Sequence, residues 1–295
     1  MPDTHGGNIF KFSHDHKINL SEVTDFSANI NLLGPSPKGL EALNERLRYI
    51  SHYPDVTNDD VMNTIADVYG IEKDSILLGN GAAELLYAVG RLSGFTGAFV
   101  PAPGFSEYQA SMDAANIPVR EIFYRQRQND DGTPYFEVPY LALQTFAAEL
   151  KGQNGRIIVF LGNPNNPDGT LLDKQSIKVL AQMLKDANSL LVIDESFIDF
   201  IGNESLRDNS HSMRELINQY DNVIIVHSFT KFYAVPGLRI GAVFANPTLI
   251  QELRQYIPAW SVNTLAQAYT ESALTDTKYI NDSKMVLANE AKYMY

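Results

Sequence analysis

The sequence predicts an α/β fold built on a mostly parallel, seven-stranded sheet with helices on both faces. Seven short apolar runs rich in β-branched residues recur along the chain, and several lack the polar–apolar alternation of a half-exposed sheet. Segments with helical spacing of apolar residues lie between many of these runs. Alternating strand and helix signals of this kind are typical of parallel sheets. The predicted strands are residues 75–78, 97–100, 118–123, 156–161, 190–193, 223–226 and 240–244.

The segments outside these strands complete the predicted order of elements. The first part of the chain lacks a strand or helix pattern and is closed by the turn residues of 34–37, so we expect an arm there. Apolar spacing predicts helices over residues 61–69 and 177–184, and one long helix from Ser261 onward. The predicted units are an N-terminal arm (1–35), a large domain (36–258) and the start of a C-terminal small domain (259–295).

Composition excludes several classes of function. The chain has 295 residues, 44% hydrophobic and 20% charged, which is ordinary for a globular protein. Its formal net charge of -12 argues against nucleic acid as the main partner. The absence of cysteine removes disulfides, thiolate nucleophiles and cysteine-bound zinc. No apolar run resembles a signal peptide core or approaches the ~18 residues of a membrane helix, so we expect a cytoplasmic protein without a membrane partner.

A glycine-rich turn follows the first predicted strand. Residues 79–84 read GNGAAE, and small residues at the start of a helix let backbone N–H groups approach a phosphate. A Rossmann dinucleotide site is one alternative, but Glu84 replaces its third glycine and no acidic residue follows about 20 positions later. A tight strand–helix turn without a ligand is the other alternative.

Two polar motifs directly follow buried strands. Residues 162–170 read GNPNNPDGT and offer amide donors, although a Pro/Asn-rich turn without a ligand is the alternative. Asp194 and Glu195 follow the next strand, where a carboxylate could pair with a cation, bind a metal, act as a base or simply cap a turn. Adjacent residues of an extended chain point to opposite faces, so we do not expect the two to share one substrate as in a glycosidase. Ligands of parallel sheets bind at the carboxyl ends of strands, where these motifs can converge.

A lysine stands just past the strand predicted over residues 223–226. Residues 228–231 read SFTK and residues 236–239 read PGLR. Burial lowers the pKa of a lysine and makes its neutral amine a nucleophile toward aldehydes. A lone lysine is usually a solvated surface residue, but here three other motifs accompany Lys231. Ser228 and Arg239 can donate hydrogen bonds to a phosphate in the same place.

Together the four motifs resemble those of fold-type I enzymes that depend on pyridoxal 5′-phosphate (PLP), in the same order and over nearly the whole chain. The resemblance implies the fold-type I transferase fold and PLP as the cofactor. It implies that Lys231 is catalytic and binds the cofactor aldehyde, and that Asp194 pairs with the ring nitrogen. Asn166 would donate to the ring hydroxyl, and Tyr108 would stack on the ring. The residues it places at the cofactor phosphate are Gly81, Ala82, Ala83, Ser228 and Arg239, with Tyr53 reaching it from the neighbouring subunit of a homodimer.

Within that family the chain is similar to threonine-phosphate decarboxylases of cobalamin biosynthesis, which themselves resemble histidinol-phosphate aminotransferases. The similarity lies in residues 5–8 (HGGN), 232–239 (FYAVPGLR) and 260–263 (WSVN), and in Phe197, where many aminotransferases have tyrosine. It implies that a small phosphorylated amino acid, O-phospho-L-threonine or O-phospho-L-serine, is decarboxylated to aminopropanol or ethanolamine phosphate. The implied substrate-binding residues are His5, Gly6, Asn29 and Asn166.

The chain departs from the family pattern after Arg239. Family members carry substrate-binding arginines in a C-terminal small domain, whereas this chain has only Arg254 beyond that point. The helical pattern from Ser261 reaches Tyr295 without a glycine or proline terminator, so we expect the small domain to be truncated. Two alternatives to the decarboxylase stay open. They are a histidinol-phosphate-type aminotransferase and, if the chain is natively this short, a non-catalytic PLP-binding protein.

Overall fold

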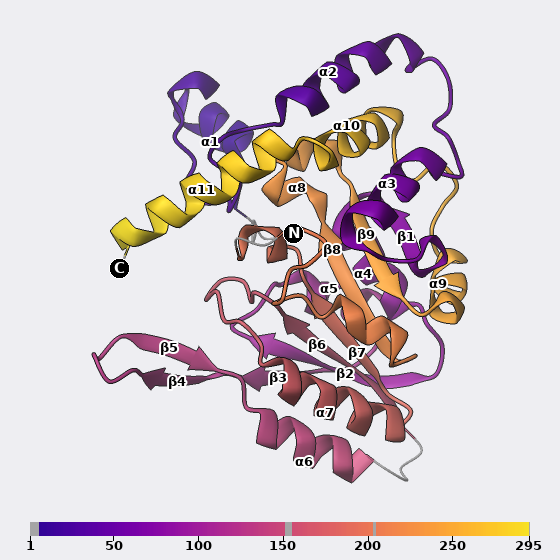
Figure 1. The fold of residues 1–295 in the computed structure, drawn as a ribbon. Helices are drawn as coiled ribbons and strands as arrows, with labels where there is room; N and C mark the ends of the chain where they lie inside the picture. Colours follow the sequence, from indigo (N-terminus) through magenta and orange to yellow (C-terminus); the bar gives the residue numbers. More distant parts are fainter. Residues whose placement is uncertain (1–5, 151–154, 203–204, 295) are drawn as a thin grey trace.

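A seven-stranded sheet runs through the centre of the computed structural model, which describes residues 6–150, 155–202 and 205–294 (Figure 1). The strand order is β1-β9-β8-β7-β6-β2-β3. Within this sheet only β9 runs antiparallel to its neighbours, so the sheet is mostly parallel as predicted. The strands are β1 (Ile76–Gly79), β2 (Phe95–Ala102), β3 (Val119–Phe123), β6 (Arg156–Gly162), β7 (Leu190–Asp194), β8 (Val223–Ser228) and β9 (Gly241–Ala245). The fold class and the seven predicted strands are confirmed.

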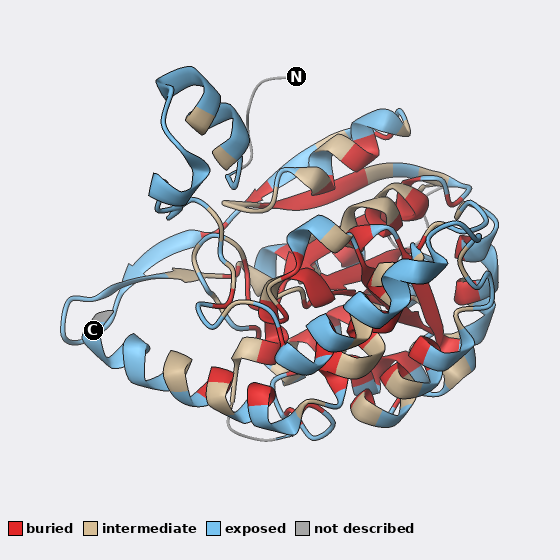
Figure 2. Ribbon diagram, turned by 90° about the horizontal axis from the view of Figure 1, so that it is seen from above, coloured by how far each residue is buried: buried red, intermediate tan, exposed pale blue. Residues whose placement is uncertain are grey.

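Both faces of the sheet are buried under helices (Figure 2). Alternate residues of β8 show this, because Ile224 and Val226 belong to one hydrophobic core and Val223 and Ile225 to the other. That arrangement explains why the strands are continuous apolar runs. One core takes side chains from α4 (Gly81–Gly90), α5 (Glu107–Ala114) and α9 (Pro247–Arg254). The other takes them from α3 (Asp59–Tyr69), α6 (Tyr140–Leu150), α7 (Lys174–Asp186) and α10 (Thr264–Leu274).

Two segments differ from the sequence prediction. The single helix expected from Ser261 is two helices, α10 and α11 (Thr277–Met294). The division falls at Asp276, whose carboxylate accepts a hydrogen bond from the Tyr279 N–H (3.1 Å) and so starts a new helix without glycine or proline. The N-terminal arm, where the sequence predicted neither a strand nor a helix, contains regular structure. It contains α1 (Ile9–His16), which has no buried residue (Figure 2).

The remaining elements connect these layers. A polar hairpin of β4 (Arg125–Gln128) and β5 (Pro134–Glu137) projects beside the main sheet (Figure 1). The short helices are α2 (Pro37–Arg46), α8 (Phe229–Phe232), η1 (Leu20–Glu22), η2 (Leu47–Tyr49), η3 (Lys73–Ser75), η4 (Ile198–Phe200), η5 (Arg214–Asn218) and η6 (Pro236–Leu238). Within the described ranges, no helix is both long and apolar enough to cross a membrane. The boundaries predicted at residues 35 and 258 stay predictions.

Candidate active site

The polar motifs converge on one pocket at the carboxyl ends of the central parallel strands. This is where ligands of open α/β sheets bind, because the loops that follow the strands meet there. Eight of the predicted site residues line the pocket, together with Phe197, which contributes to the family similarity, and four others. The lining residues are Ala82, Ala83, Phe105, Tyr108, Pro164, Asn166, Asp194, Ser196, Phe197, Ser228, Thr230, Lys231 and Arg239.

One end of the pocket has the geometry of an anion site. The turn from β1 into α4 brings Gly81 against Arg239, at a backbone φ of +81°. A Cβ at Gly81 would lie 2.3 Å from Nη2 of Arg239, so only glycine lets the two approach. The first N–H groups of α4 have no carbonyl partner within the helix and carry its positive dipole end. We call Gly81, Ala82, Ala83, Ser228 and Arg239 the anion cradle.

Two further contacts shape the anion cradle. A Cβ at Gly241, the first residue of β9, would lie 2.6 Å from the backbone N of Ala82, so the strand and the start of α4 are in direct contact. The hydroxyl oxygens of Ser228 and Thr230 lie 2.8 Å apart at the end of β8. Backbone N–H groups, a guanidinium and a hydroxyl therefore surround one position, which is the donor set that binds a phosphate.

Lys231 lies next to the anion cradle, on the short helix α8 that follows β8. It is half-buried, and burial lowers the pKa of its ammonium group below the ordinary value of 10.5. The positive charge of Arg239 lowers that pKa further, and Asp194 opposes both effects. The neutral amine is thereby favoured, which is the form that attacks an aldehyde.

Asp194 ends β7 with only 6% of its surface exposed. Its carboxylate accepts hydrogen bonds from the Tyr108 hydroxyl (2.9 Å) and from the Ser196 N–H (2.8 Å). Burial, and then the charge of Asp194, raise the pKa of Tyr108 far above its usual range, so the phenol keeps the proton that it donates. Both bonds fix the carboxylate at the strand end, where it can hold a protonated ring nitrogen.

Tyr108, which we predict to stack on the cofactor ring, lines the pocket from a buried position. Its ring is 2% exposed and stacks on Phe160 (centroids 5.3 Å apart), while its hydroxyl is occupied by Asp194. The half-buried ring of Phe105 lines the pocket beside it and contacts Tyr108 edge-on at 5.7 Å. Two aromatic side chains, Phe105 and Tyr108, therefore line the pocket, and Tyr108 also holds Asp194 through its hydroxyl. Phe105 precedes Tyr108 by three residues in the chain.

The loop after β6 is fixed to its neighbours on both sides. The Asn163 N–H donates to the Asp194 carbonyl (2.7 Å), which continues the pairing of β6 with β7. The Asn165 side chain donates to the Pro103 carbonyl (3.0 Å) of the loop that carries Phe105. These bonds hold the loop so that the half-buried Asn166 lines the pocket. The asparagines of this loop therefore have a structural role.

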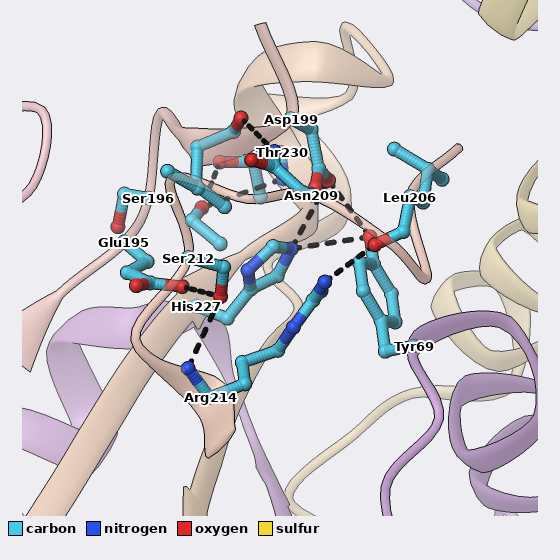
Figure 3. A network of polar contacts seen from close by, with 12 residues as sticks. Tyr69, Glu195, Ser196, Asp199, Leu206, Asn209, Ser212, Arg214, His227 and Thr230 are labelled. Atoms are coloured by element: carbon cyan, nitrogen blue, oxygen red, sulfur yellow. Dashed lines mark hydrogen bonds and ion pairs between the residues drawn. The ribbon is translucent and has the colours of Figure 1, made fainter. Parts of the chain in front are cut away.

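A buried polar network formed by Tyr69, Asp199 and His227 lies close in the chain to two residues of the pocket wall (Figure 3). The Tyr69 hydroxyl donates to Oδ2 of Asp199 (2.7 Å), and Nε2 of His227 lies 3.2 Å from the same oxygen. Asp199 follows Phe197 by two residues, and His227 immediately precedes Ser228. The sequence did not single out these residues, because Tyr69 and His227 are 158 positions apart.

Glu195 anchors the other end of this network and faces away from the pocket, as the alternation of an extended chain predicts. It is fully buried, and its carboxylate accepts from the Ser212 hydroxyl (2.7 Å) and the Met213 N–H (2.5 Å). Burial raises the pKa of Glu195, although Arg214 and these two donors counteract part of that effect. Glu195 and Asp194 therefore serve different sides of the strand end.

Four of the predicted residues that the structure describes do not line this pocket. Gly81 is one of them, because it lies against Arg239 at the start of α4. Gly6 lines a separate groove along β2 and α5, and Asn29 is exposed on the arm. Tyr53 is 79% exposed and stacks on Trp260 with ring centroids 4.6 Å apart. His5 lies outside the described residues.

Comparison with known families agrees with this geometry. The profile of the aminotransferase class I and II family matches residues 21–295, nearly the whole chain. The chain belongs to this family. PLP is the cofactor of the family and of this chain. The pocket fits that group, because the anion cradle suits its phosphate and excludes a Cβ at Gly81, while Lys231 and Asp194 suit its aldehyde and its ring nitrogen.

Several relatives within the aminotransferase class I and II family span most of the chain. An adenosylcobalamin biosynthesis bifunctional protein of Leptospira interrogans is 35% identical over 283 residues, which is 95% of this chain and 30% of that protein. A threonine-phosphate decarboxylase of Salmonella typhimurium is 32% identical over 281 residues, covering 93% of this chain and 71% of that protein. The solved histidinol-phosphate aminotransferase of Clostridium acetobutylicum has a TM-score of 0.78 at 26% identity, covering 92% of this chain and 75% of the other.

Proposed function

We propose that this chain is a PLP-dependent decarboxylase of O-phospho-L-threonine, with O-phospho-L-serine as the second candidate substrate. The observation that carries the proposal is the convergence of Lys231, Asp194 and the anion cradle in one pocket of a chain 32% identical to a threonine-phosphate decarboxylase. The product would be aminopropanol phosphate, or ethanolamine phosphate from phosphoserine. The similarity to a cobalamin biosynthesis protein supports the nucleotide loop of cobalamin as the use of that product.

The pocket residues divide the binding of PLP among them. The anion cradle would hold its phosphate through the N–H groups of Gly81 and Ala82, with Ala83 nearby, the Ser228 hydroxyl and the Arg239 guanidinium. Asp194 would pair with the ring nitrogen, and Asn166 would donate to the ring hydroxyl. Lys231 would bind the aldehyde carbon through Nζ. When bound, PLP supplies an electron sink for negative charge that develops at Cα of an amino acid.

Lys231 has a second role in this proposal. Decarboxylation breaks the bond between Cα and the carboxylate carbon, carbon dioxide leaves, and the electron pair stays with the substrate. A proton must then reach Cα. The Nζ ammonium of Lys231, which lines the pocket, is the donor that we assign to this step, and its lowered pKa eases the release of that proton.

Of the arm residues predicted to bind the substrate, those that the structure describes do not line the pocket described above, and the role of the arm in substrate selection is part of this proposal. We propose that His5, Gly6 and Asn29 face the substrate, with His5 and Asn29 toward its phosphate, and that Asn166 contacts both substrate and cofactor. The half-buried Phe197 adds an apolar wall where a tyrosine hydroxyl would offer another donor to the ring oxygen. These assignments explain how one cofactor site could favour loss of the carboxylate over loss of the Cα proton.

A histidinol-phosphate-type aminotransferase is the second candidate. Its support is the TM-score of 0.78 to such an enzyme. Both reactions use the same cofactor residues and differ in which bond to Cα is held perpendicular to the ring. The grip on the substrate, rather than Lys231 or Asp194, therefore separates the two candidates.

The deciding experiment incubates the PLP-loaded protein with O-phospho-L-threonine. We expect release of carbon dioxide and formation of aminopropanol phosphate, both abolished by Lys231→Ala. Lys178→Ala is the control, because this lysine does not line the pocket and forms a partly exposed ion pair with Glu215 (3.1 Å). Accumulation of a keto acid with the cofactor in its amine form would establish the aminotransferase instead. Bound PLP without either product would contradict both candidates.

A further inference from the structure

Residues 260–263 touch both halves of the anion cradle, which come from opposite parts of the chain. One half is the turn from β1 into α4, around Gly81. The other half is the segment from β8 to β9, with Arg239. Residues 260–263 lie between α9 and α10 and line no part of the pocket. We call them the bridging segment.

The first contact runs from the bridging segment to the α4 turn through Glu84. Its Oε2 accepts hydrogen bonds from the Asn80 N–H (2.7 Å) and from the Ser261 hydroxyl. The Asn80 bond occupies one N–H group at the start of α4. The next N–H groups, those of Gly81 and Ala82, are the ones assigned to the phosphate. Ser261 holds the same carboxylate from a position 177 residues away.

The second contact runs to the other half through Asn263. Its Nδ2 donates to the carbonyl of Leu238 (2.9 Å), the residue immediately before Arg239. Arg239 has a left-handed backbone, with φ of +55°, which is unfavourable for any residue with a Cβ. A fixed carbonyl at Leu238 therefore helps to keep Arg239 in the conformation that brings its guanidinium onto Gly81.

The bridging segment is itself firmly held. Oδ1 of Asn263 accepts from the Ala266 N–H (2.9 Å) and caps α10, while Val262 is 2% exposed in the core. Gln267 donates to the Val262 carbonyl (3.0 Å) and to the Asp55 carbonyl (3.0 Å). Because the bridging segment is anchored in this way, its hydrogen bonds can hold both halves of the cradle in place.

We propose that Ser261 and Asn263 are positioning residues that hold the two halves of the anion cradle at the spacing a phosphate requires. The bridging segment keeps the α4 N–H groups facing the Arg239 guanidinium. Loss of either contact would let one half move relative to the other, and the phosphate would be gripped less well. The inference rests on the PLP site of the proposed function but not on the reaction catalysed there.

The test compares PLP with pyridoxal, which lacks the phosphate. Ser261→Ala removes the hydroxyl from Glu84. Asn263→Ser keeps a side chain able to cap α10 but is too short to reach the Leu238 carbonyl. Dissociation constants are measured by equilibrium dialysis. We expect each variant to raise the dissociation constant of PLP about fivefold, the effect of one net hydrogen bond. The dissociation constant of pyridoxal should stay within about twofold of the wild-type value.

Matched controls make the same substitutions elsewhere. Asn246→Ser replaces the residue that caps α9, at the end of β9 away from the cradle. Ser176→Ala removes a hydroxyl that donates to Asp173 (2.5 Å) at the start of α7. Neither control should change the dissociation constant of PLP. Ser261→Thr keeps the hydroxyl and should retain wild-type PLP affinity, which also guards against a misfolded alanine variant.

Three outcomes would overturn the inference. Unchanged PLP affinity in both variants would show that the contacts do not position the cradle. Equally weakened binding of PLP and of pyridoxal would show that Ser261 and Asn263 have only a general structural role. Equal affinity of the wild type for PLP and pyridoxal would remove the cradle assignment itself, and the proposed function with it. A failed decarboxylation assay with the expected binding pattern would leave this inference standing.

Discussion

Lys231 carries a charge that its surroundings disfavour. Burial and Arg239 lower the pKa of its ammonium group below 10.5, so the folded protein binds fewer protons than the unfolded chain between the folded pKa and 10.5. The destabilising effect is complete below the folded pKa and disappears above 10.5. This is the expected state of an amine prepared to react before any cofactor arrives.

Lys231→Met should therefore stabilise the cofactor-free protein at neutral pH. The gain should shrink as the pH rises and vanish above 10.5, where both states are neutral. Thermal unfolding of wild type and variant across this range checks the prediction. Lys178→Met, which removes a partly exposed lysine that does not line the pocket, should show no such pH-dependent gain. A gain that stays constant with pH would mean that apolar contact, rather than charge, is responsible.

Asp199 shows the opposite behaviour in the buried polar network with Tyr69 and His227. Burial alone would raise its pKa, but His227, the Tyr69 hydroxyl and Arg214 outweigh burial and lower it below 3.8. The ionised carboxylate therefore stabilises the fold above that value, and the contribution is lost as the pH falls through the lowered pKa.

We predict that Asp199→Asn costs about 3 kcal/mol of unfolding free energy at neutral pH, because it leaves buried partners without their anion. The difference from wild type should narrow in acid. Urea unfolding at several pH values measures it. Asp221→Asn removes an exposed ion pair with Lys185 (3.0 Å) and should cost less than about 1 kcal/mol. Equal costs for the two variants would contradict the role given to the network.

At the scale of the element, Asp276 decides where one helix ends and the next begins. Its carboxylate accepts from the Tyr279 N–H (3.1 Å) and from the Ser36 hydroxyl (2.7 Å). It thus caps α11 and ties that helix to the start of α2. Asp276→Ala should lower the unfolding free energy by about 1 kcal/mol, the usual effect of a lost helix cap, as measured by denaturant titration.

Asp276→Asn should recover most of that loss, because an amide oxygen can accept the same hydrogen bond. Asp282→Ala serves as the control, since this residue makes only an exposed ion pair with Lys278 one turn away. Its expected cost is about 0.5 kcal/mol or less. If Asp276→Ala were no more harmful than Asp282→Ala, α10 and α11 would behave as one helix, as the sequence first suggested.

The main sheet could be predicted because its strands are buried on both faces and therefore read as apolar runs. The β4–β5 hairpin gave no such signal, since Arg125 to Gln128 are all exposed. The exposed helix α1 likewise buries no apolar face. Local composition identifies elements that contribute to the core and misses those that do not.

The pocket was predicted in part for a related reason. Motifs at strand ends identified Lys231, Asp194 and the anion cradle, because topology brings the carboxyl ends of parallel strands together. The sequence could not show that Phe105 lines the pocket beside Tyr108, since that depends on how the loop before α5 is placed. The contacts of the bridging segment to the cradle join residues 25 and 177 positions apart, a distance at which one sequence shows no pairing.

At the scale of the whole molecule, exposed apolar side chains gather in the first part of the chain. Phe10, Phe26, Ile50 and Tyr53 are between 65% and 93% exposed. Soluble monomers rarely display so many large apolar side chains together. We propose that this region, with the exposed stack of Tyr53 and Trp260, is the contact surface of a homodimer in which Tyr53 reaches the neighbouring phosphate site.

Sedimentation equilibrium should accordingly give twice the chain mass of 32.9 kDa. Ile50→Asp should shift the protein toward the monomer by placing a charge on the proposed surface. Leu141→Asp, at a residue 77% exposed on α6, is the control and should leave the mass unchanged. A wild-type protein that sediments as a monomer at micromolar concentration would exclude the homodimer without affecting the pocket within one chain.

The central claim is that PLP is bound covalently at Lys231 within the anion cradle. Borohydride reduction of the PLP-loaded protein, followed by proteolysis and mass spectrometry, tests it most directly. We predict one stoichiometric adduct, located on the peptide that contains Lys231 and absent from Lys231→Met. An adduct spread over exposed lysines, or persisting in that variant at equal yield, would contradict the account.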